Sequence, residues 1–176
     1  MSVHISLPEK ILNGMFDECE RYLEEETGGR LLGFWTWKGT DLRIDVRAVL
    51  PAGPKARRSR VDLFQDGDYQ EQLFRAVEKQ HPTIAHLGNW HTHHCNGLRT
   101  LSMGDCETYR KIVNSPKHAQ DFFYALLITH GTPNEQRRYA FRHFIFVRHA
   151  TDFVEVAPSN VTIADSPLLA VRSSGG

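Results

Sequence analysis

The stretch TIAHLGNWHTHHCNGLRTLSMGD, residues 83–105, joins an apolar segment to three histidines, a serine and an aspartate. Residues 83–93 are typical of a strand, and the histidines lie at the C-terminal end of that strand. Ser102 is a residue type that caps helices, so the sequence predicts a helix from Met103 to about Val113. This prediction places Asp105 in the first turn of the helix. One short segment therefore supplies imidazoles, a hydroxyl and a carboxylate.

The flanking sequence predicts further helices and strands around this segment. On the N-terminal side we expect a capping box at Ser6 to Glu9 that starts a helix running to about Glu25. The elements expected next are strands at 31–37 and 42–50, a basic loop at 51–60 and a helix at 66–80. Those expected on the C-terminal side are strands at 121–130, 139–149 and 152–156. This order predicts an α/β fold, more closely an α+β sandwich with a mixed central sheet flanked by helices.

The bulk composition limits the class of protein. The chain has 176 residues, the size of one domain with its own core, which we assign to 1–157 with a C-terminal tail at 158–176. Its 21 basic side chains balance 21 acidic ones, which does not favour nucleic-acid binding. The three cysteines form no CxxC pair, and no segment is typical of a membrane helix or a secretory signal. We therefore expect a reduced, cytoplasmic protein that binds neither nucleic acid nor membrane.

The triplet His91-Thr92-His93 is a candidate metal-binding pattern. Residues i and i+2 of a strand point to the same face, so the two imidazoles converge from one side. A neutral imidazole nitrogen binds zinc at about 2.0–2.1 Å, and Asp105 would add a carboxylate ligand. Three protein ligands leave a fourth position for water, as in catalytic zinc sites. His91, His93 and Asp105 are therefore candidate ligands of one Zn²⁺ ion per chain.

A hydrolase with such a site also needs a group that moves protons. The segment EEETGGRLLG, residues 24–33, offers glutamates followed by two glycines at the start of a strand. Glycines at that place permit close packing beside the metal site. Ser102 supplies a hydroxyl that can stabilise an oxyanion, or it serves only as a helix cap.

Together these residues resemble the signature of the JAMM/MPN-plus metalloproteases. The matching set is Glu26-x-x-Gly29-x-x-x-Gly33, His91-x-His93 and Ser102-x-x-Asp105, and the element order fits over roughly residues 6–150. The resemblance implies that His91, His93 and Asp105 bind zinc. It further implies that Glu26 is the general acid/base and that Ser102 assists the oxyanion. The implied architecture is the MPN fold, which is similar to that of cytidine deaminases.

The chain departs from the family pattern at two places. His94 stands where the family usually has a proline directly after the second histidine. The link from His93 to Ser102 is one residue longer than usual, a difference that a turn at Asn96-Gly97 can absorb.

The same resemblance implies a substrate class. Family members remove ubiquitin or ubiquitin-like proteins from their conjugates, so the expected reaction is peptide or isopeptide cleavage after a terminal Gly-Gly. The expected partners are a ubiquitin-like protein, its conjugates, and ubiquitin-like activating and conjugating enzymes, in a bacterial pathway such as antiphage defence. Two alternatives stay open, namely release of a small group from a ubiquitin-like sulfur carrier and a non-catalytic MPN-type scaffold. The scaffold fits less well, because scaffold members typically lack a ligand or the glutamate.

Two further segments each have two interpretations. The basic residues Lys55, Arg57, Arg58 and Arg60 are either a solvated loop or a contact for the tail of a ubiquitin-like partner, which the family holds beside its sheet. The terminal Gly175-Gly176 is either a flexible end or a functional diglycine.

Overall fold

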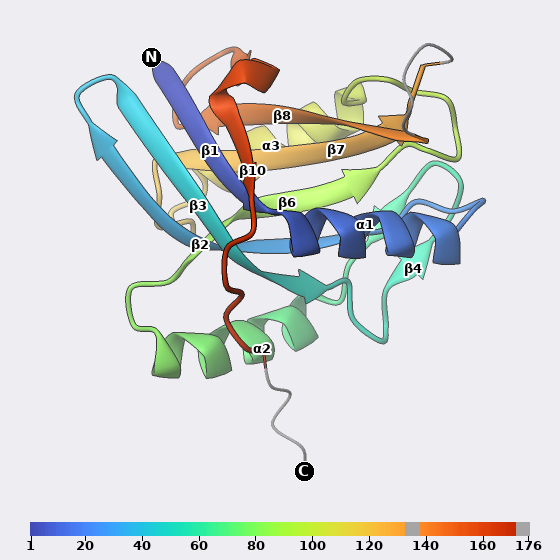
Figure 1. Ribbon diagram of the computed structural model, residues 1–176, viewed down its shortest axis with the longest axis horizontal. Helices are drawn as coiled ribbons and strands as arrows, with labels where there is room; N and C mark the ends of the chain where they lie inside the picture. Colours follow the sequence, from blue (N-terminus) through green and yellow to red (C-terminus); the bar gives the residue numbers. More distant parts are fainter. Residues whose placement is uncertain (133–137, 172–176) are drawn as a thin grey trace.

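A computed structural model describes residues 1–132 and 138–171 of the protein. Within these residues, an eight-stranded mixed sheet carries three α-helices (Figure 1). The strands, in their order across the sheet, are β10 (Val161–Ala164), β1 (Ser2–Pro8), β3 (Asp41–Pro51), β2 (Gly28–Lys38), β6 (Ala85–Thr92), β7 (Phe122–His130), β8 (Tyr139–Val147) and β9 (Phe153–Glu155). The helices are α1 (Glu9–Arg21), α2 (Gly67–Gln80) and α3 (Met103–Asn114). The expected mixed α+β fold is confirmed at this level.

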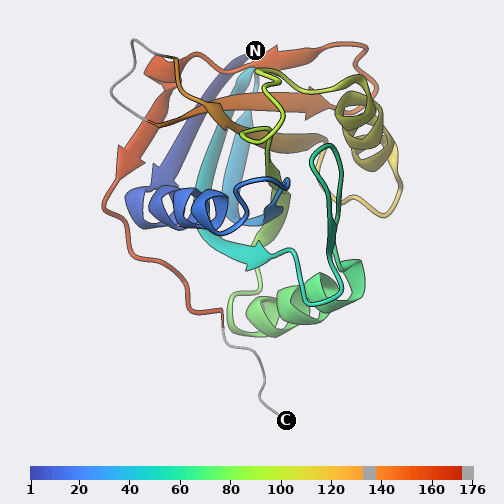
Figure 2. The ribbon, with the colours of Figure 1, turned by 90° about the vertical axis from the view of Figure 1, so that its right-hand side faces the viewer.

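The interior strand β7 is buried on both faces, and its successive side chains pack in two different core clusters. Phe122, Tyr124 and Leu126 pack in the cluster that includes α1, whereas Phe123 and Ala125 pack with α3. Successive side chains of a strand point to opposite faces, so α1 and α3 cover opposite faces of the sheet. Figure 2 shows this arrangement, with α1 and α3 on either side of the curled sheet and α2 below it.

A β-bulge lets β3 contribute to two clusters on opposite faces. The pairing of β2 with β3 shifts between Leu32 and Gly33, so that Val46 and Ala48 pair with neighbouring residues of β2. Val46 therefore packs in the cluster with α1, and Ala48 packs in the cluster with α2. A bulge reverses the side-chain alternation in this way because it adds one residue to one strand.

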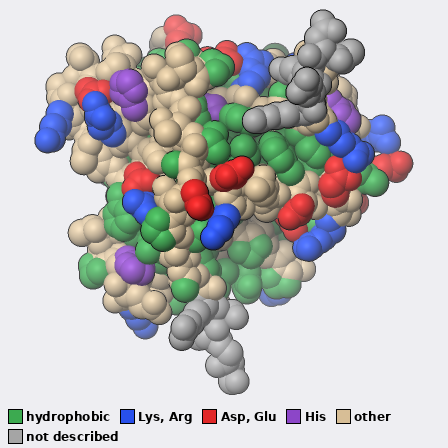
Figure 3. All heavy atoms as spheres, viewed as in Figure 1, with side chains coloured by type: hydrophobic (Ala, Val, Ile, Leu, Met, Phe, Trp, Pro, Cys, Tyr) green, Lys and Arg blue, Asp and Glu red, His purple; other side chains and the backbone are tan. Residues whose placement is uncertain are grey.

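The molecular surface carries charges of both signs. On the face drawn in Figure 3, acidic and basic side chains are interspersed, with no large area of one sign. No helix among the described residues is long and apolar enough to cross a membrane.

The expected start of the first helix is wrong. Ser6 lies in β1, which pairs in parallel with β3 and β10, and α1 begins at Glu9 after Pro8 without a side-chain cap. Alternate residues of β1 are buried, so tertiary packing and strand pairing outweigh the local capping pattern. The helix also ends at Arg21 rather than near Glu25. Residues 22–25 form a turn that leads to Glu26.

Two segments expected to be irregular form strands. The basic loop contains β4 (Arg57–Arg58), which pairs with β5 (Leu63–Phe64) as a two-stranded hairpin, called here the β4–β5 hairpin. The expected tail contains a 3₁₀ turn, η1 (Pro158–Asn160), followed by β10, which pairs in parallel with β1. Part of the range assigned to a tail thus belongs to the main sheet. Gly175-Gly176 and most of the turn after β7 lie outside the described residues.

Candidate metal centre

The two histidines lie at the end of β6, where the sheet is paired on both sides. Gly28 of β2 pairs with His91 on one side, and Leu127 of the parallel strand β7 pairs with it on the other. The amide of His93, just beyond the strand, donates to Ile128 O at 2.8 Å. Strand pairing therefore holds the backbone of both histidines in place. His91 and His93 are 4% and 2% exposed.

Three potential ligand atoms converge at this strand end. His91 Nε2 lies 3.2 Å from His93 Nε2, and Asp105 Oδ2 lies 3.4 Å and 3.3 Å from these two atoms. Ligands bound tetrahedrally at about 2.0–2.1 Å from zinc are about 3.3–3.4 Å apart, because a tetrahedron's edge is about 1.63 times its bond length. The observed triangle has edges of this size. Within the part of the chain that is described, this is the cluster of His, Cys, Asp or Glu side chains that could hold a metal ion.

The far nitrogens of both imidazoles have partners that orient the rings. His93 Nδ1 lies 2.9 Å from Thr100 O, and a carbonyl oxygen can only accept, so Nδ1 carries the proton. His91 Nδ1 lies 2.9 Å from the hydroxyl of Tyr109 on α3. Burial raises the pKa of Tyr109 well above its ordinary value, so the phenol stays protonated. Such partners fix the orientation of metal-binding histidines and make them better ligands.

These hydrogen bonds create a conflict that a cation would resolve. With Nδ1 protonated, the Nε2 atom of neutral His93 is an acceptor, and it faces Asp105 Oδ2 at 3.3 Å. Two acceptors that are largely shielded from water repel each other at this distance, whereas a metal ion between them would use both lone pairs as ligands. The three residues therefore fit a divalent metal through one atom each.

Asp105 is placed by the start of α3, as the sequence predicts. Ser102 is the N-cap, and its side chain accepts from Asp105 N at 3.1 Å while Asp105 accepts from Ser102 N at 2.7 Å. The Ser102 hydroxyl also donates to Asp105 Oδ2 at 2.7 Å. Burial opposes ionisation of Asp105, but the adjoining side chains of His91, His93 and Ser102 outweigh it and hold the carboxyl pKa well below its usual range. The structure gives Ser102 a capping role, and its role at an oxyanion stays a prediction.

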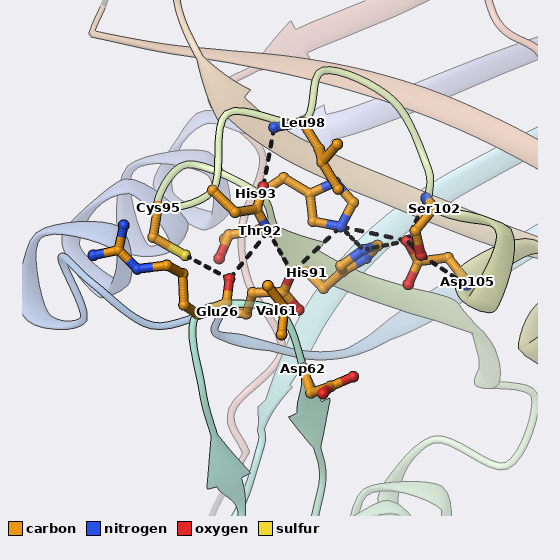
Figure 4. Close-up of polar contacts among 12 residues, drawn as sticks. Glu26, Val61, Asp62, His91, Thr92, His93, Cys95, Leu98, Ser102 and Asp105 are labelled. Atoms are coloured by element: carbon orange, nitrogen blue, oxygen red, sulfur yellow. Dashed lines mark hydrogen bonds and ion pairs between the residues drawn. The ribbon is translucent and has the colours of Figure 1, made fainter.

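Glu26 reaches the cluster from a different part of the chain. Its Oε1 lies 3.5 Å from His93 Nε2, and the residue is only 4% exposed. Figure 4 shows Glu26 on one side of the two histidines, with Ser102 and Asp105 on the other. Gly28, two residues after Glu26, allows β2 to lie close to β6 at this point, because a Cβ on Gly28 would lie 2.3 Å from Trp90 O.

The environment of Glu26 changes its acidity. Desolvation by burial is the largest effect on the Glu26 carboxyl; together with the nearby Asp105, and against the opposite effects of His93 and Asn96, it raises the pKa to about 7. A carboxyl near neutral pKa can both accept and return a proton.

Sequence reasoning missed three residues that hold this site in place. Tyr109, Thr100 and Asn96 contact His91, His93 and Glu26 respectively. Their spacing from the ligands follows no short motif, so only the fold reveals them. His94 points away from the cluster, as the alternation of a strand predicts, and its Nε2 lies 2.8 Å from Tyr22 O.

The fold and the cluster define a chain with a buried two-histidine, one-carboxylate site beside a glutamate. No family model matches the sequence. The chain is 26% identical over 132 residues to a protein described as probable metalloprotease y4qB of Sinorhizobium fredii, covering 74% of this chain and 78% of that protein. Its fold is similar to the solution structure of protein DSY2949 from Desulfitobacterium hafniense, with a TM-score of 0.56 and 19% identity over 93% of this chain and 94% of the other.

Proposed function

We propose that this chain is a zinc-dependent metalloprotease of the JAMM/MPN-plus type. The observation that carries the proposal is the triangle of His91 Nε2, His93 Nε2 and Asp105 Oδ2, with Glu26 Oε1 3.5 Å from one of its corners. The similarity to a probable metalloprotease supports the same class. The fold and the quoted sequence signature support the subtype.

Each residue of the site would have a separate role in peptide hydrolysis. His91, His93 and Asp105 would hold the zinc ion, which supplies Lewis acidity toward water and the scissile carbonyl. Glu26 takes a proton from the attacking water and returns it to the leaving amine. Burial removes competing water from Glu26 and His93, so that the charge of the Glu26 carboxylate acts at full strength. Ser102 would share the oxyanion through its hydroxyl.

The surroundings suit a peptide substrate. Val61 of the β4–β5 hairpin, Leu98 after the histidines and Met103 at the start of α3 are all large, apolar and exposed. Exposed apolar side chains around a polar site are typical of a surface that binds another chain. We propose that the chain bound there is the C-terminal end of a ubiquitin-like protein, cut after Gly-Gly during precursor processing or deconjugation. Glycines suit a narrow approach to a buried site because they lack a Cβ.

The test is cleavage of a ubiquitin-like protein that carries an extension after its C-terminal Gly-Gly. Wild type is compared with Glu26→Ala, and zinc is measured in both samples. Cleavage by wild type alone, with zinc retained in both, is the expected result. Cleavage by both proteins would reject Glu26 as the proton carrier, and a wild type that binds no zinc would reject the site. Release of a small group from the C-terminus of a sulfur carrier, without cleavage of the extended protein, would favour that alternative substrate.

A further inference from the structure

Asn96 lies in the link between the histidines and Ser102, and its side chain joins three segments of the chain. Asn96 Nδ2 donates to Glu26 Oε1 at 2.9 Å and to Arg60 O at 3.1 Å. Its Oδ1 accepts from Leu98 N at 3.0 Å. An amide nitrogen of the backbone can only donate, so this contact fixes which side-chain atom is oxygen and directs the NH₂ group at Glu26. Both hydrogens of the side-chain amide are thereby used.

Arg60 belongs to the turn of the β4–β5 hairpin, and this turn contacts Glu26. Glu26 N donates to Ser59 O at 2.8 Å, one residue before the carbonyl that Asn96 holds. Cys95 Sγ also donates to Arg60 O, at 3.4 Å, but a thiol is a weak donor. Figures 1 and 2 both show the hairpin beside the loop that follows β6. The side chain of Asn96 is thus the strong polar link from the histidine loop to the hairpin among the described contacts.

We infer that Asn96 is a positioning residue, which aims the Glu26 carboxylate at the metal cluster and fastens the β4–β5 hairpin over it. This inference rests on the proposed function for the role of Glu26, but the hairpin contact stands apart from it. The carboxylate oxygen that Asn96 holds is the one that lies 3.5 Å from His93 Nε2. A glutamate side chain has three rotatable bonds, so without this donor the carboxylate would spread over several rotamers. A misplacement of about 1 Å can cost about 100-fold in rate.

The first test needs no activity and uses limited digestion with trypsin. The bond after Arg60 is in the hairpin turn, where the Arg60 side chain is 62% exposed. Asn96→Ala should increase the rate of cleavage after Arg60 severalfold, whereas Asn13→Ala, on the exposed side of α1, should not. Thermal unfolding of each variant shows whether global stability explains the difference. Equal cleavage rates in wild type and Asn96→Ala would overturn the inference.

The second test reverses the hydrogen bond. Asn96→Asp replaces the donor by a second carboxylate beside Glu26, and it should open the hairpin at least as much as Asn96→Ala. Combining it with Glu26→Gln supplies a side-chain amide that donates to the new carboxylate, so the melting temperature lost in Asn96→Asp should partly return, although the bond to Arg60 O stays broken. No recovery in the double variant would show that the two side chains do not interact through this bond, and the inference would fail.

The third test measures turnover of the extended ubiquitin-like protein. Asn96→Ala should lower kcat by up to about 100-fold with bound zinc unchanged. In a Glu26→Ala background, the same substitution should lower the residual rate no further, because Asn96 acts through Glu26. A further loss of the same size in that background would overturn the positioning role. If wild type shows no turnover at all, the proposed function fails, and the digestion tests still decide whether Asn96 fastens the hairpin.

Discussion

Asp105 Oδ2 lies 3.3 Å from His93 Nε2, and neither atom carries a proton when the imidazole is neutral. On the other side of the ring, His93 Nδ1–H donates a hydrogen bond to Thr100 O. The fold thus directs two acceptors at each other in a site where both residues are largely shielded from water. Such an arrangement is unfavourable by itself and favourable around a cation, which relates the packing of β6 and α3 to metal binding.

The hydrogen bond between Tyr109 and His91 predicts a specific loss of metal affinity. Tyr109→Phe removes the hydroxyl that lies 2.9 Å from His91 Nδ1 and should weaken zinc binding about 10–100-fold. The matched control is Tyr124→Phe, which removes a hydroxyl 2.6 Å from Nδ1 of His143, outside the cluster. Both variants should lose stability, but only the first should lose affinity in a competition titration with a zinc chelator. Equal affinities for the two variants would show that Tyr109 does not support the ligand.

Capping by Ser102 predicts a moderate loss of stability. Ser102→Ala removes an N-cap and a hydrogen bond to Asp105 Oδ2, and should lower the free energy of unfolding by about 1 kcal/mol. Ser102→Thr keeps a hydroxyl at the cap and should retain most of the stability. Urea denaturation of the metal-free proteins measures both values. If Ser102→Ala is as stable as wild type, the cap seen here contributes nothing.

Two glycines should respond to alanine in opposite directions. In Gly28→Ala the new Cβ would lie 2.3 Å from Trp90 O and 3.1 Å from His91 Cα, so strand pairing beside the cluster must shift. We expect a loss of about 2–3 kcal/mol and weaker zinc binding. Gly14 lies in α1, where an added Cβ would have nothing within 4 Å, so Gly14→Ala should gain about 0.5–1 kcal/mol. Thermal unfolding with and without zinc distinguishes these results, and a neutral Gly28→Ala would contradict the steric argument.

Two histidines outside the cluster, the half-buried His86 and the buried His143, make the fold sensitive to acid. Burial lowers the pKa of His86 and of His143 from 6.5 to about 4. The unfolded chain takes up these protons near pH 6.5 and the folded chain only near pH 4, so stability present above pH 6.5 is lost as the pH falls through that range. We expect the metal-free protein to lose on the order of 3–5 kcal/mol between pH 7 and 4.5. His143→Gln should reduce this loss by about half, and an unchanged pH dependence would exclude His143 as a source.

Most of the fold follows from local pattern, and the exceptions have physical causes. The helices at α2 and α3 have clear caps in Asp66 and Ser102, and their buried faces follow the helical period. The strand β1 is not predicted from the sequence, because Ser6 and Glu9 form a local capping pattern that is typical of a helix start. Pairing of β1 with β3 outweighs this pattern. The short strand β10 has little pattern of its own, and it forms because the edge of β1 offers partners for its backbone.

The candidate ligands are predictable because the two histidines and Asp105 are close in sequence and follow simple periodicities. Glu26 is selected only through a resemblance, since Glu24 and Glu25 have the same chemistry. The supporting residues Tyr109 and Asn96 cannot be inferred, because their roles depend on how α3 and the hairpin pack against β6.

The geometry of His91, His93 and Asp105 is compatible with binding one metal ion, and Glu26 is not part of this group. The decisive experiment is the zinc content per chain after gel filtration, measured by elemental mass spectrometry for wild type, Asp105→Ala and Glu26→Gln. We expect about one zinc in wild type and in Glu26→Gln, and strongly reduced zinc in Asp105→Ala. Full zinc content in Asp105→Ala, or its loss in Glu26→Gln, would show that the ligand set is wrong.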